Sequence, residues 1–271
     1  MTRLHCLRPL AFLLLAGISA TAPAQQALHF EEHFGDFAGC ALLLTRDRHQ
    51  ELRLEFGAGH CALPLSPCST FKIPNAMIGM QEGVVTGPDD LKTWDGTPHE
   101  REINNRDHSL ASAIEHSVVW YFQSLARAVG AQRMQAWLDR LDYGNRDISG
   151  GIDQFWLGSS LRINAYQQLD LVLRLQHETL PFHHSVQQAM HEMLIQPSDL
   201  PGVLHGKTGS CRGAREHPDH GWYIGWIDWQ KGLPRNPATT WFVINISGAQ
   251  AWGWQARPIA LKLLAELQAG D

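Results

Sequence analysis

The chain has 271 residues, of which 44% are hydrophobic and 18% are charged, and its formal net charge at neutral pH is −5. This composition is typical of globular proteins and excludes collagen-like chains and chains too polar to form a core. The length allows one large domain or two small ones, and the acidic balance disfavours nucleic acid as a partner.

Residues 1–24 have the pattern of a secretory signal peptide. Arg3 and Arg8 precede an apolar run at residues 10–16, and Ala22-Pro23-Ala24 offers the small residues that a signal peptidase reads. The run is too short to span a bilayer, and no later stretch approaches the ~18 apolar residues that a membrane helix needs. Removal of the signal leaves 20 basic and 27 acidic residues, a net charge of −7. We therefore expect a secreted, soluble mature chain from about residue 25, without a membrane anchor.

The first elements of the mature chain are predicted to be a β-hairpin and a helix. Residues 39–44 are apolar, residues 51–56 alternate between polar and apolar, and a polar turn separates the two runs. The helix is expected from Ser69 or Thr70 to about Gln81, with Pro74 in or near its first turn, where a missing N–H is tolerated.

From about residue 89 to residue 200 the pattern is helical. Helices are predicted at residues 124–141, 164–177 and 185–196, the first ending near Tyr143-Gly144, where glycine can close a helix. Three runs rich in aromatic and β-branched residues follow at 203–209, 221–229 and 239–247, and they predict strands. A final helix is expected from about Gln255, with Pro258 in its opening turn.

Strands at both ends of the chain with helices between them predict an α/β (α+β) fold. An antiparallel sheet formed from both chain ends would carry flanking helices and an inserted all-helical subdomain. We expect one catalytic domain over residues 25–271, with a sheet subdomain at 25–88 and 201–271 and a helical subdomain at 89–200. A cleft should lie between the two parts.

Ser69 and Lys72 stand at the start of the first predicted helix. Residues three apart share a helix face, so the lysine amine can reach the serine hydroxyl, and the first N–H groups of the helix favour a developing oxyanion. Serine is a poor nucleophile until a base takes its proton, and lysine acts as a base only when burial keeps it neutral. A helix-capping serine beside a solvated lysine is the alternative, and this pair alone does not decide between them.

Two later motifs favour the catalytic interpretation. Ser117, in Ser117-Val118-Val119, could relay a proton, and Lys207-Thr208-Gly209 could bind a substrate carboxylate, with the glycine letting the substrate lie close to the strand. S-x-x-K, S-x-x and K-T-G in this order form the pattern of penicillin-recognising serine enzymes. Three ordered motifs are far more specific than any one of them.

The chain resembles the class D, oxacillinase-type β-lactamases over essentially the whole mature sequence. The similar segments are residues 69–75, Ser117-Val118-Val119, Tyr143-Gly144-Asn145, Lys207-Thr208-Gly209, Phe155-Trp156-Leu157 and Trp94-Asp95-Gly96. Class A enzymes are a poorer match, because they carry S-D-N at the second motif. Their acidic deacylation base also lacks an obvious counterpart in this chain.

The resemblance implies that the protein hydrolyses the β-lactam ring of penicillins and related antibiotics through a Ser69 acyl-enzyme, confers resistance to them, and acts in the periplasm of a Gram-negative bacterium. It also implies that Lys72 reacts with CO2 from bicarbonate to give N6-carboxylysine, the general base; no other cofactor, metal or nucleotide is expected. Val119, Phe122, Trp156 and Leu157 could form an apolar shell that keeps Lys72 neutral. The indole N–H of Trp156 would steady the carbamate.

The resemblance also assigns the other roles at the site. Ser117 would pass a proton to the β-lactam nitrogen, and backbone N–H groups of Ser69 and Ser210 would form the oxyanion hole. The substrate, a small-molecule β-lactam, would be held by the following residues: Val119, Lys207, Thr208, Gly209, Ser210 and Arg257. Arg257 has the loosest match, and a surface arginine opening the last helix is its alternative. Tyr143 and Asn145 are expected to shape a turn and to do no chemistry.

Four cysteines remain after signal removal, and two disulfides are a natural use of them in an exported protein. If both oxyanion N–H groups converge on one oxygen, the neighbours of Ser69 and Ser210 approach each other too. We therefore hypothesise a Cys68–Cys211 disulfide, similar in spacing to a bridge in some class A carbapenem-hydrolysing enzymes, and a second between Cys40 and Cys61. The bridge requires Cα atoms within about 7 Å. Four buried free thiols are the alternative.

Other proteins could share such a site. A penicillin-binding transpeptidase would be acylated and then stall, as would a β-lactam sensor, and a non-catalytic periplasmic binding protein could use the same cleft. Missing transmembrane spans disfavour the sensor, and the short chain and the Trp156 context disfavour the transpeptidase. Arg212 and Arg215 follow the K-T-G strand and could tune substrate preference, but the sequence does not specify the substrate spectrum or the oligomeric state.

Overall fold

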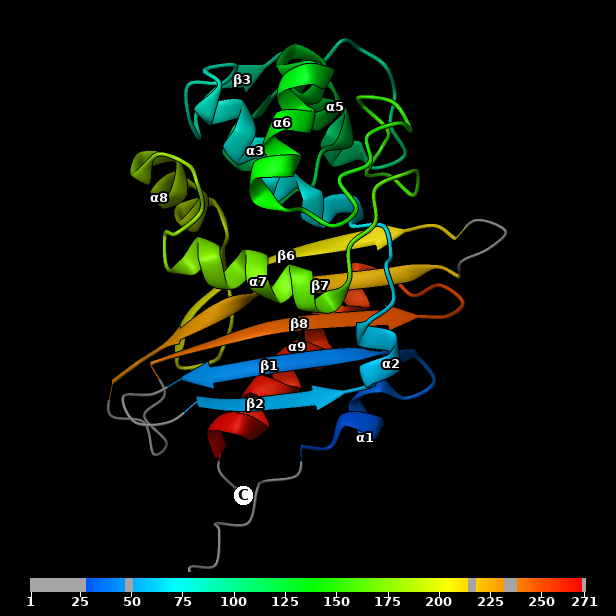
Figure 1. The fold of residues 1–271 in the computed structure, drawn as a ribbon, viewed down its shortest axis with the longest axis vertical. Coiled ribbons are helices and arrows are strands. Elements are labelled where there is room, and N and C mark those ends of the chain that lie inside the picture. Colours follow the sequence, from blue (N-terminus) through cyan, green and yellow to red (C-terminus); the bar gives the residue numbers. More distant parts are fainter. Residues whose placement is uncertain (1–27, 47–50, 214–217, 232–237, 270–271) are drawn as a thin grey trace, which may run out of the picture.

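The computed structural model describes residues 28–46, 51–213, 218–231 and 238–269. The expected signal peptide and Arg215 lie outside these residues. A six-stranded sheet runs through the molecule in the order β2-β1-β8-β7-β6-β5, with every neighbouring pair antiparallel (Figure 1). Its strands are β1 (Ala38–Arg46), β2 (Glu51–Phe56), β5 (Ile195–Gln196), β6 (Gly202–Cys211), β7 (His220–Trp229) and β8 (Thr239–Ser247).

The two ends of the chain meet in the middle of this sheet. β1, from the N-terminal hairpin, pairs with β8 from the C-terminal part in the register Ala41↔Ile244. β8 is buried along its whole length, and its sequence is rich in the β-branched and aromatic residues that fit a pleated, packed surface. The predicted antiparallel sheet built from both chain ends is therefore confirmed.

One face of the sheet is covered by α1 (Phe30–Phe34) and α9 (Gly253–Ala269) (Figure 1). α9 turns the apolar stripe expected from its sequence toward the strands, through Ile259, Leu263, Leu264 and Leu267. These side chains form the first core cluster together with residues such as Tyr223 on β7. This is called the α9 face below.

The other face carries the helical layer and is called the helical face below. α7 (Ala165–Gln176) lies directly on the strands, with α3 (Lys72–Gln81) and the remaining helices beyond it (Figure 1). α3 belongs to the range expected for the sheet subdomain, yet it packs against helices α5 and α8. The other elements of this layer are α2 (Ala58–Cys61), the 3-10 turn η1 (Cys68–Phe71), β3 (Leu91–Lys92), η2 (Glu102–Asn104), β4 (His108–Ser109), α4 (Leu110–Glu115), α5 (Val119–Val129), α6 (Ala131–Leu141) and α8 (His184–Met193).

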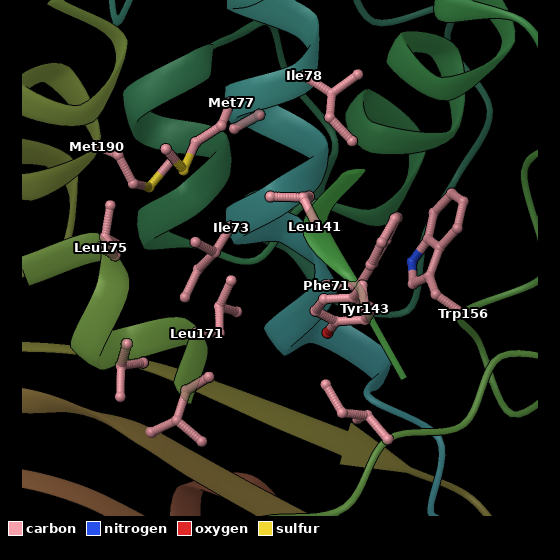
Figure 2. Packing of buried hydrophobic residues seen from close by; sticks show 14 of the residues in the cluster. Phe71, Ile73, Met77, Ile78, Leu141, Tyr143, Trp156, Leu171, Leu175 and Met190 are labelled. Atoms are coloured by element: carbon pink, nitrogen blue, oxygen red, sulfur yellow. The ribbon is translucent and has the colours of Figure 1, made fainter. Parts of the chain in front are cut away.

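Side chains from this layer and from the sheet form the second core cluster. Figure 2 shows its centre, where Phe71, Tyr143 and Trp156 lie together beside the start of α3. The ring centroids of Phe71 lie 5.5 Å from those of Tyr143 and 5.4 Å from those of Trp156. Within the described residues, no helix combines the length and the apolarity needed to cross a bilayer.

The helices differ from the sequence prediction at two places. The single helix predicted at residues 124–141 is wrong: the chain forms α5 and α6, which are separated at Gly130. Gly130 has φ 83° and ψ 154°, a conformation that a helix cannot contain and that glycine adopts readily. The helix predicted to reach Gln196 ends at Met193, and Ile195–Gln196 form β5 instead. The helix predicted at 164–177 is confirmed, with a capping box between Asn164 and Gln167.

Candidate active site

Ser69 lies in the tight 3-10 turn η1, immediately before α3. Cys68 has φ 45°, and the Thr70 hydroxyl donates a hydrogen bond to the Pro67 carbonyl at 2.8 Å. A non-glycine residue in this region of backbone space is held there by its surroundings. The turn therefore fixes Ser69 where the chain passes from the sheet into the helical layer.

Lys72 contacts Ser69 directly. Its Nζ donates a hydrogen bond to Ser69 Oγ at 2.8 Å, and its side chain is completely buried. Burial lowers the pKa of Lys72 well below the ordinary value, and the positive charges of Lys207 and Arg101 lower it further. A neutral amine has a lone pair, so at this distance the Lys72 amine can accept the proton of the Ser69 hydroxyl.

Ser117 and Lys207 form a second polar pair beside the first. Ser117 lies between α4 and α5 with φ 57°, and it accepts a hydrogen bond from Lys207 Nζ at 3.1 Å. Lys207 is nearly buried on β6, and burial, together with the charge of Arg101, lowers its pKa to about 7. The pair thus combines a hydroxyl with an amine that exchanges protons near neutral pH.

The K-T-G segment of β6 forms one wall of the site. A Cβ on Gly209 would lie 2.8 Å from the Pro67 carbonyl oxygen and 3.2 Å from Thr70 N, so the missing side chain lets η1 approach the strand. The structure thus shows a close approach of η1 at this glycine, and the expected close approach of the substrate stays a prediction. Ser210 accepts a hydrogen bond from Gly253 N at 2.9 Å, which fixes the end of the strand.

A cleft of about 790 Å³ opens between β6 and the helical layer. Five of the predicted site residues line it: Ser69, Ser117, Val119, Thr208 and Ser210. Residues that the sequence did not single out for the site line it as well, namely Glu100, Arg101, Asn104, Glu115, His116, Trp252 and Trp254. Arg212, which the sequence named as a candidate for tuning substrate preference, also lines it.

Trp156 is fully buried beside the start of α3 (Figure 2). Its indole Nε1 is buried and has no hydrogen-bond acceptor among the described residues. Indole N–H groups usually find a partner when buried, so this donor, on a ring packed 5.4 Å from that of Phe71, is free to bind an additional acceptor. Phe122, another member of the expected apolar shell, places its ring centroid 5.5 Å from Lys72 Nζ.

Ser66 is a residue that the sequence gave no reason to select. Its hydroxyl donates to the Trp156 carbonyl at 2.9 Å and accepts from Gly158 N at 3.0 Å, while its own carbonyl accepts from Trp222 Nε1 at 2.9 Å. Ser66 thereby joins the segment before Ser69 to the loop that carries Trp156 and Gly158, called the Trp156 loop below, and to β7. A lone serine outside any motif carries no sequence signal for such a role.

Both expected disulfides are present. The Cα atoms of Cys68 and Cys211 are 5.8 Å apart, and those of Cys40 and Cys61 are 4.9 Å apart. Both distances lie within the range that a disulfide permits. The first bridge ties η1 to the end of β6, next to the nucleophile. Among the described residues, no three His, Cys, Asp or Glu side chains gather into a metal site.

The structure does not bring Arg257 to the cleft. Its guanidinium donates to the Pro197 carbonyl, and its charge acts on Tyr223, whose side chain belongs to the α9 face. The N-terminal end of α9 reaches the cleft through Trp254, but Arg257, less than one turn further along the helix, does not line it. The arginines that line the cleft are Arg101 and Arg212.

Tyr143 and Asn145 support the Trp156 loop. Tyr143 is buried against Phe71, and Asn145 Oδ1 accepts from Arg162 N at 2.9 Å while its Nδ2 donates to the Ser160 carbonyl at 2.9 Å. Gly144 between them has φ 56°, and a Cβ there would lie 2.0 Å from the Arg162 carbonyl oxygen. These contacts shape a turn, as expected from the sequence.

Known proteins are similar to this chain in sequence and in fold. The penicillin binding protein transpeptidase domain family matches residues 39–264. A probable β-lactamase of Bacillus subtilis, YbxI, is 37% identical over 88% of this chain and 84% of its own. The β-lactamase OXA-48 of Klebsiella pneumoniae is 34% identical over 74% of this chain and 73% of its own. The solved class D β-lactamase BAT-2 superposes with a TM-score of 0.79 at 38% identity, covering 89% of this chain and 95% of that one. The chain therefore belongs to the class D serine β-lactamases, which carry the transpeptidase fold.

Proposed function

We propose that the protein hydrolyses penicillins through an acyl-enzyme on Ser69, with Lys72 as the group that moves the protons. The observation that carries this proposal is the 2.8 Å contact between Lys72 Nζ and Ser69 Oγ, made by an amine that is completely buried. Desolvation disfavours the ammonium form, which could not receive the serine proton.

The same burial suits Lys72 for reaction with CO2, because only a neutral amine attacks CO2. The carbamate would supply an anionic base that can activate the deacylating water. The orphaned Nε1 of buried Trp156 offers this group a hydrogen-bond donor, and the positive charges of Lys207 and Arg101 favour an anion at this place. Bicarbonate is therefore the source of the only modification that the mechanism requires.

The remaining steps fall to residues around the cleft. Ser117, held by Lys207 at 3.1 Å, passes a proton to the ring nitrogen as the ring opens. Lys207 and Thr208 hold the substrate carboxylate. Backbone N–H groups of Ser69 and Ser210 receive the oxyanion, a contribution of about 2.7 to 4 kcal/mol per donor.

The secretory pattern of residues 1–24 supports export to the periplasm, where β-lactams act. An exported enzyme that destroys penicillins would confer resistance on the cell that makes it. Growth of a susceptible Gram-negative host on ampicillin, with and without the expressed chain, tests this role.

The mechanism is tested by benzylpenicillin turnover with and without added bicarbonate, using the wild type and Lys72→Ala. We expect bicarbonate to raise the wild-type rate and Lys72→Ala to abolish turnover at any bicarbonate concentration. Turnover at the wild-type rate in Lys72→Ala would refute the mechanism. Stoichiometric labelling of Ser69 without turnover in the wild type would instead identify a penicillin-binding protein.

A further inference from the structure

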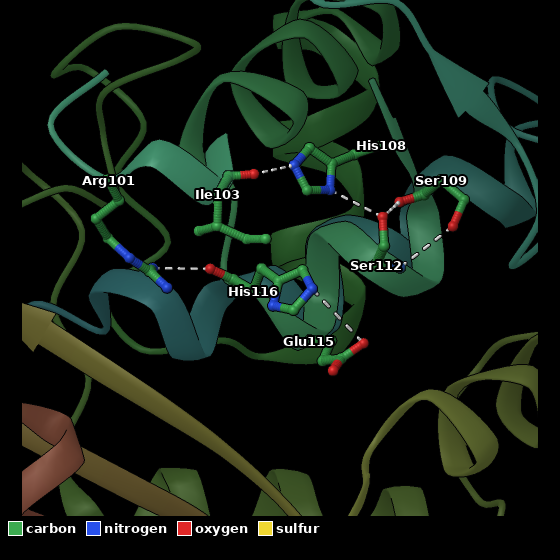
Figure 3. Close-up of polar contacts among 7 residues, drawn as sticks. All are labelled: Arg101, Ile103, His108, Ser109, Ser112, Glu115 and His116. Atoms are coloured by element: carbon green, nitrogen blue, oxygen red, sulfur yellow. Dashed lines mark hydrogen bonds and ion pairs between the residues drawn. The ribbon is translucent and has the colours of Figure 1, made fainter. Parts of the chain in front are cut away.

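Arg101 lines the cleft beside the proton-relay serine. It immediately precedes η2, its side chain is exposed, and one guanidinium nitrogen donates to the His116 carbonyl at 2.8 Å (Figure 3). His116 is the residue before Ser117. The hydrogen bond therefore holds the guanidinium next to the site of leaving-group protonation.

The charge of Arg101 is not neutralised by the protein. Among the described residues, the His116 carbonyl is its only hydrogen-bond partner, and no carboxylate forms an ion pair with it. The two acids that line the same cleft pair elsewhere, Glu100 with Arg212 at 3.8 Å and Glu115 with His116 at 3.9 Å. A guanidinium has five N–H donors in a fork that matches a carboxylate, so most of its donors face solvent or a ligand.

The field of Arg101 also reaches the reacting groups. Arg101 lines the same cleft as Ser69 and Ser117, and its charge lowers the pKa of both Lys72 and Lys207. Because the pKa of Lys207 is about 7, that amine is only partly charged at neutral pH. Arg101 and Arg212 are both always charged, but Arg212 pairs with Glu100, so among the described residues Arg101 is the cleft arginine whose charge no carboxylate pairs with.

The chemistry of the substrate decides which anion would lie next to the Arg101 guanidinium. In a bicyclic β-lactam, the carboxylate is carried by a carbon bonded to the ring nitrogen. When Ser117 reaches that nitrogen, the carboxylate must lie close to Ser117 and therefore close to the guanidinium held on the His116 carbonyl. Thr208 would approach the same carboxylate from the opposite wall.

We propose that Arg101 binds the ring carboxylate of the substrate, in the role that the sequence had suggested for Arg257. The proposal rests on the proposed function, because it takes Ser117 as the donor to the ring nitrogen. Binding by Arg101 would orient the ring so that its carbonyl faces Ser69, and it adds no chemical step.

The test pairs variants of the protein with a charged and an uncharged form of one substrate. Arg101→Gln, Arg101→Lys and the control Arg106→Gln, which removes an exposed arginine from the same loop, are compared on benzylpenicillin and on its methyl ester. For Arg101→Gln we expect kcat/KM on the acid to fall about tenfold or more, as for the loss of a charge-assisted hydrogen bond, and to change little on the ester. Arg101→Lys should retain part of the activity on the acid, and Arg106→Gln should match the wild type.

Two results would overturn the proposal. An equal loss on acid and ester in Arg101→Gln would show that Arg101 acts only through the lysines or the fold, and an unchanged kcat/KM on the acid would show that it does not bind the carboxylate. The rate of Ser69 acylation is followed by mass spectrometry alongside turnover. If the wild type is acylated but does not turn over, the proposed hydrolysis is wrong, and the acylation rates of the variants still test the role of Arg101. If the wild type is not acylated, the proposed hydrolysis and the proposed role of Arg101 are both wrong.

Discussion

The two faces of the sheet bury side chains of different kinds. On the α9 face, Leu263, Leu264 and their neighbours pack into an almost entirely apolar cluster. On the helical face, the core includes Lys72 and Lys207, whose pKa values are both lowered by burial. Burial of an amine destabilises the folded state, whereas burial of a leucine side chain stabilises it. Both faces bury apolar side chains that stabilise the molecule, and the helical face in addition buries two amines at a cost in stability.

The largest effect expected on the helical face is that of Lys72→Met. Turnover of penicillin should fall by a factor of about 10³ or more, because Ser69 loses its base. The melting temperature should stay the same or rise, since the variant no longer buries an amine. Enzyme kinetics and thermal unfolding measure the two quantities. The control is Lys262→Met at an exposed position on α9, which should leave both turnover and melting temperature unchanged. A lower melting temperature in Lys72→Met with turnover retained would contradict the difference between the two faces.

The opposite result is expected on the α9 face from Leu263→Ala. Removal of this fully buried side chain should lower the free energy of unfolding by about 2 to 5 kcal/mol. At a temperature where the variant is folded, its kcat should equal that of the wild type, because the site lies across the sheet. Chemical denaturation and kinetics test this, with Leu261→Ala, a partly buried neighbour, as the milder control. A loss of kcat would show that the two faces are coupled.

The buried amine of Lys207 should make stability depend on pH. Its pKa is about 7 in the folded protein and about 10.5 in the unfolded chain, so between these values the unfolded chain binds the extra proton. Stability should therefore rise with pH through this window and fall as the pH drops toward 7. Lys207→Met should remove this pH dependence, which changes the free energy of unfolding by on the order of a few kcal/mol across the window.

The measurement compares denaturant unfolding of the wild type and Lys207→Met at several pH values between about 7 and 9, below the range in which the buried tyrosines titrate. Parallel stability curves for the two proteins would mean that Lys207 titrates normally. Lys262→Met should leave the wild-type slope intact.

The smallest effect is expected from Arg257→Gln. Its guanidinium lies on the α9 side, with the Pro197 carbonyl as its partner, so KM and kcat for benzylpenicillin should remain within about twofold of the wild type. Steady-state kinetics alongside Arg101→Gln checks this directly. A large rise in KM in Arg257→Gln would return the carboxylate-binding role to that residue.

The sequence predicted the parts of the site that lie in regular elements at fixed spacing. Ser69 lies in η1 and Lys72 begins α3, three residues further on, and Lys207 lies on β6, so helical and strand spacing predict which way these side chains point. The ordered motifs then showed that these elements meet. The sheet was predictable for the same reason, because its apolar and β-branched runs are continuous.

What the sequence did not reveal depends on irregular backbone. Arg101 and Ser66 stand in loops, where no period indicates the direction of a side chain, and Gly130 resembles a tolerated helix glycine until its positive φ is known. Arg257 was assigned to the cleft by a loose match beside Pro258; it does not line the cleft, although Trp254 at the start of the same helix does, and the linear pattern does not indicate this difference. Which face of a sheet a helix covers depends on how distant parts of the chain pack together, and the local sequence does not determine it.

The Cys68–Cys211 bridge has a consequence for the integrity of the chain. It closes a ring that contains residues 68 to 211 and therefore most of the helical layer. A protease that cuts one peptide bond inside this ring opens it without releasing a fragment, and the nucleophile and the K-T-G strand stay covalently linked. A nicked molecule would thus run as one species on a non-reducing gel and as two after reduction.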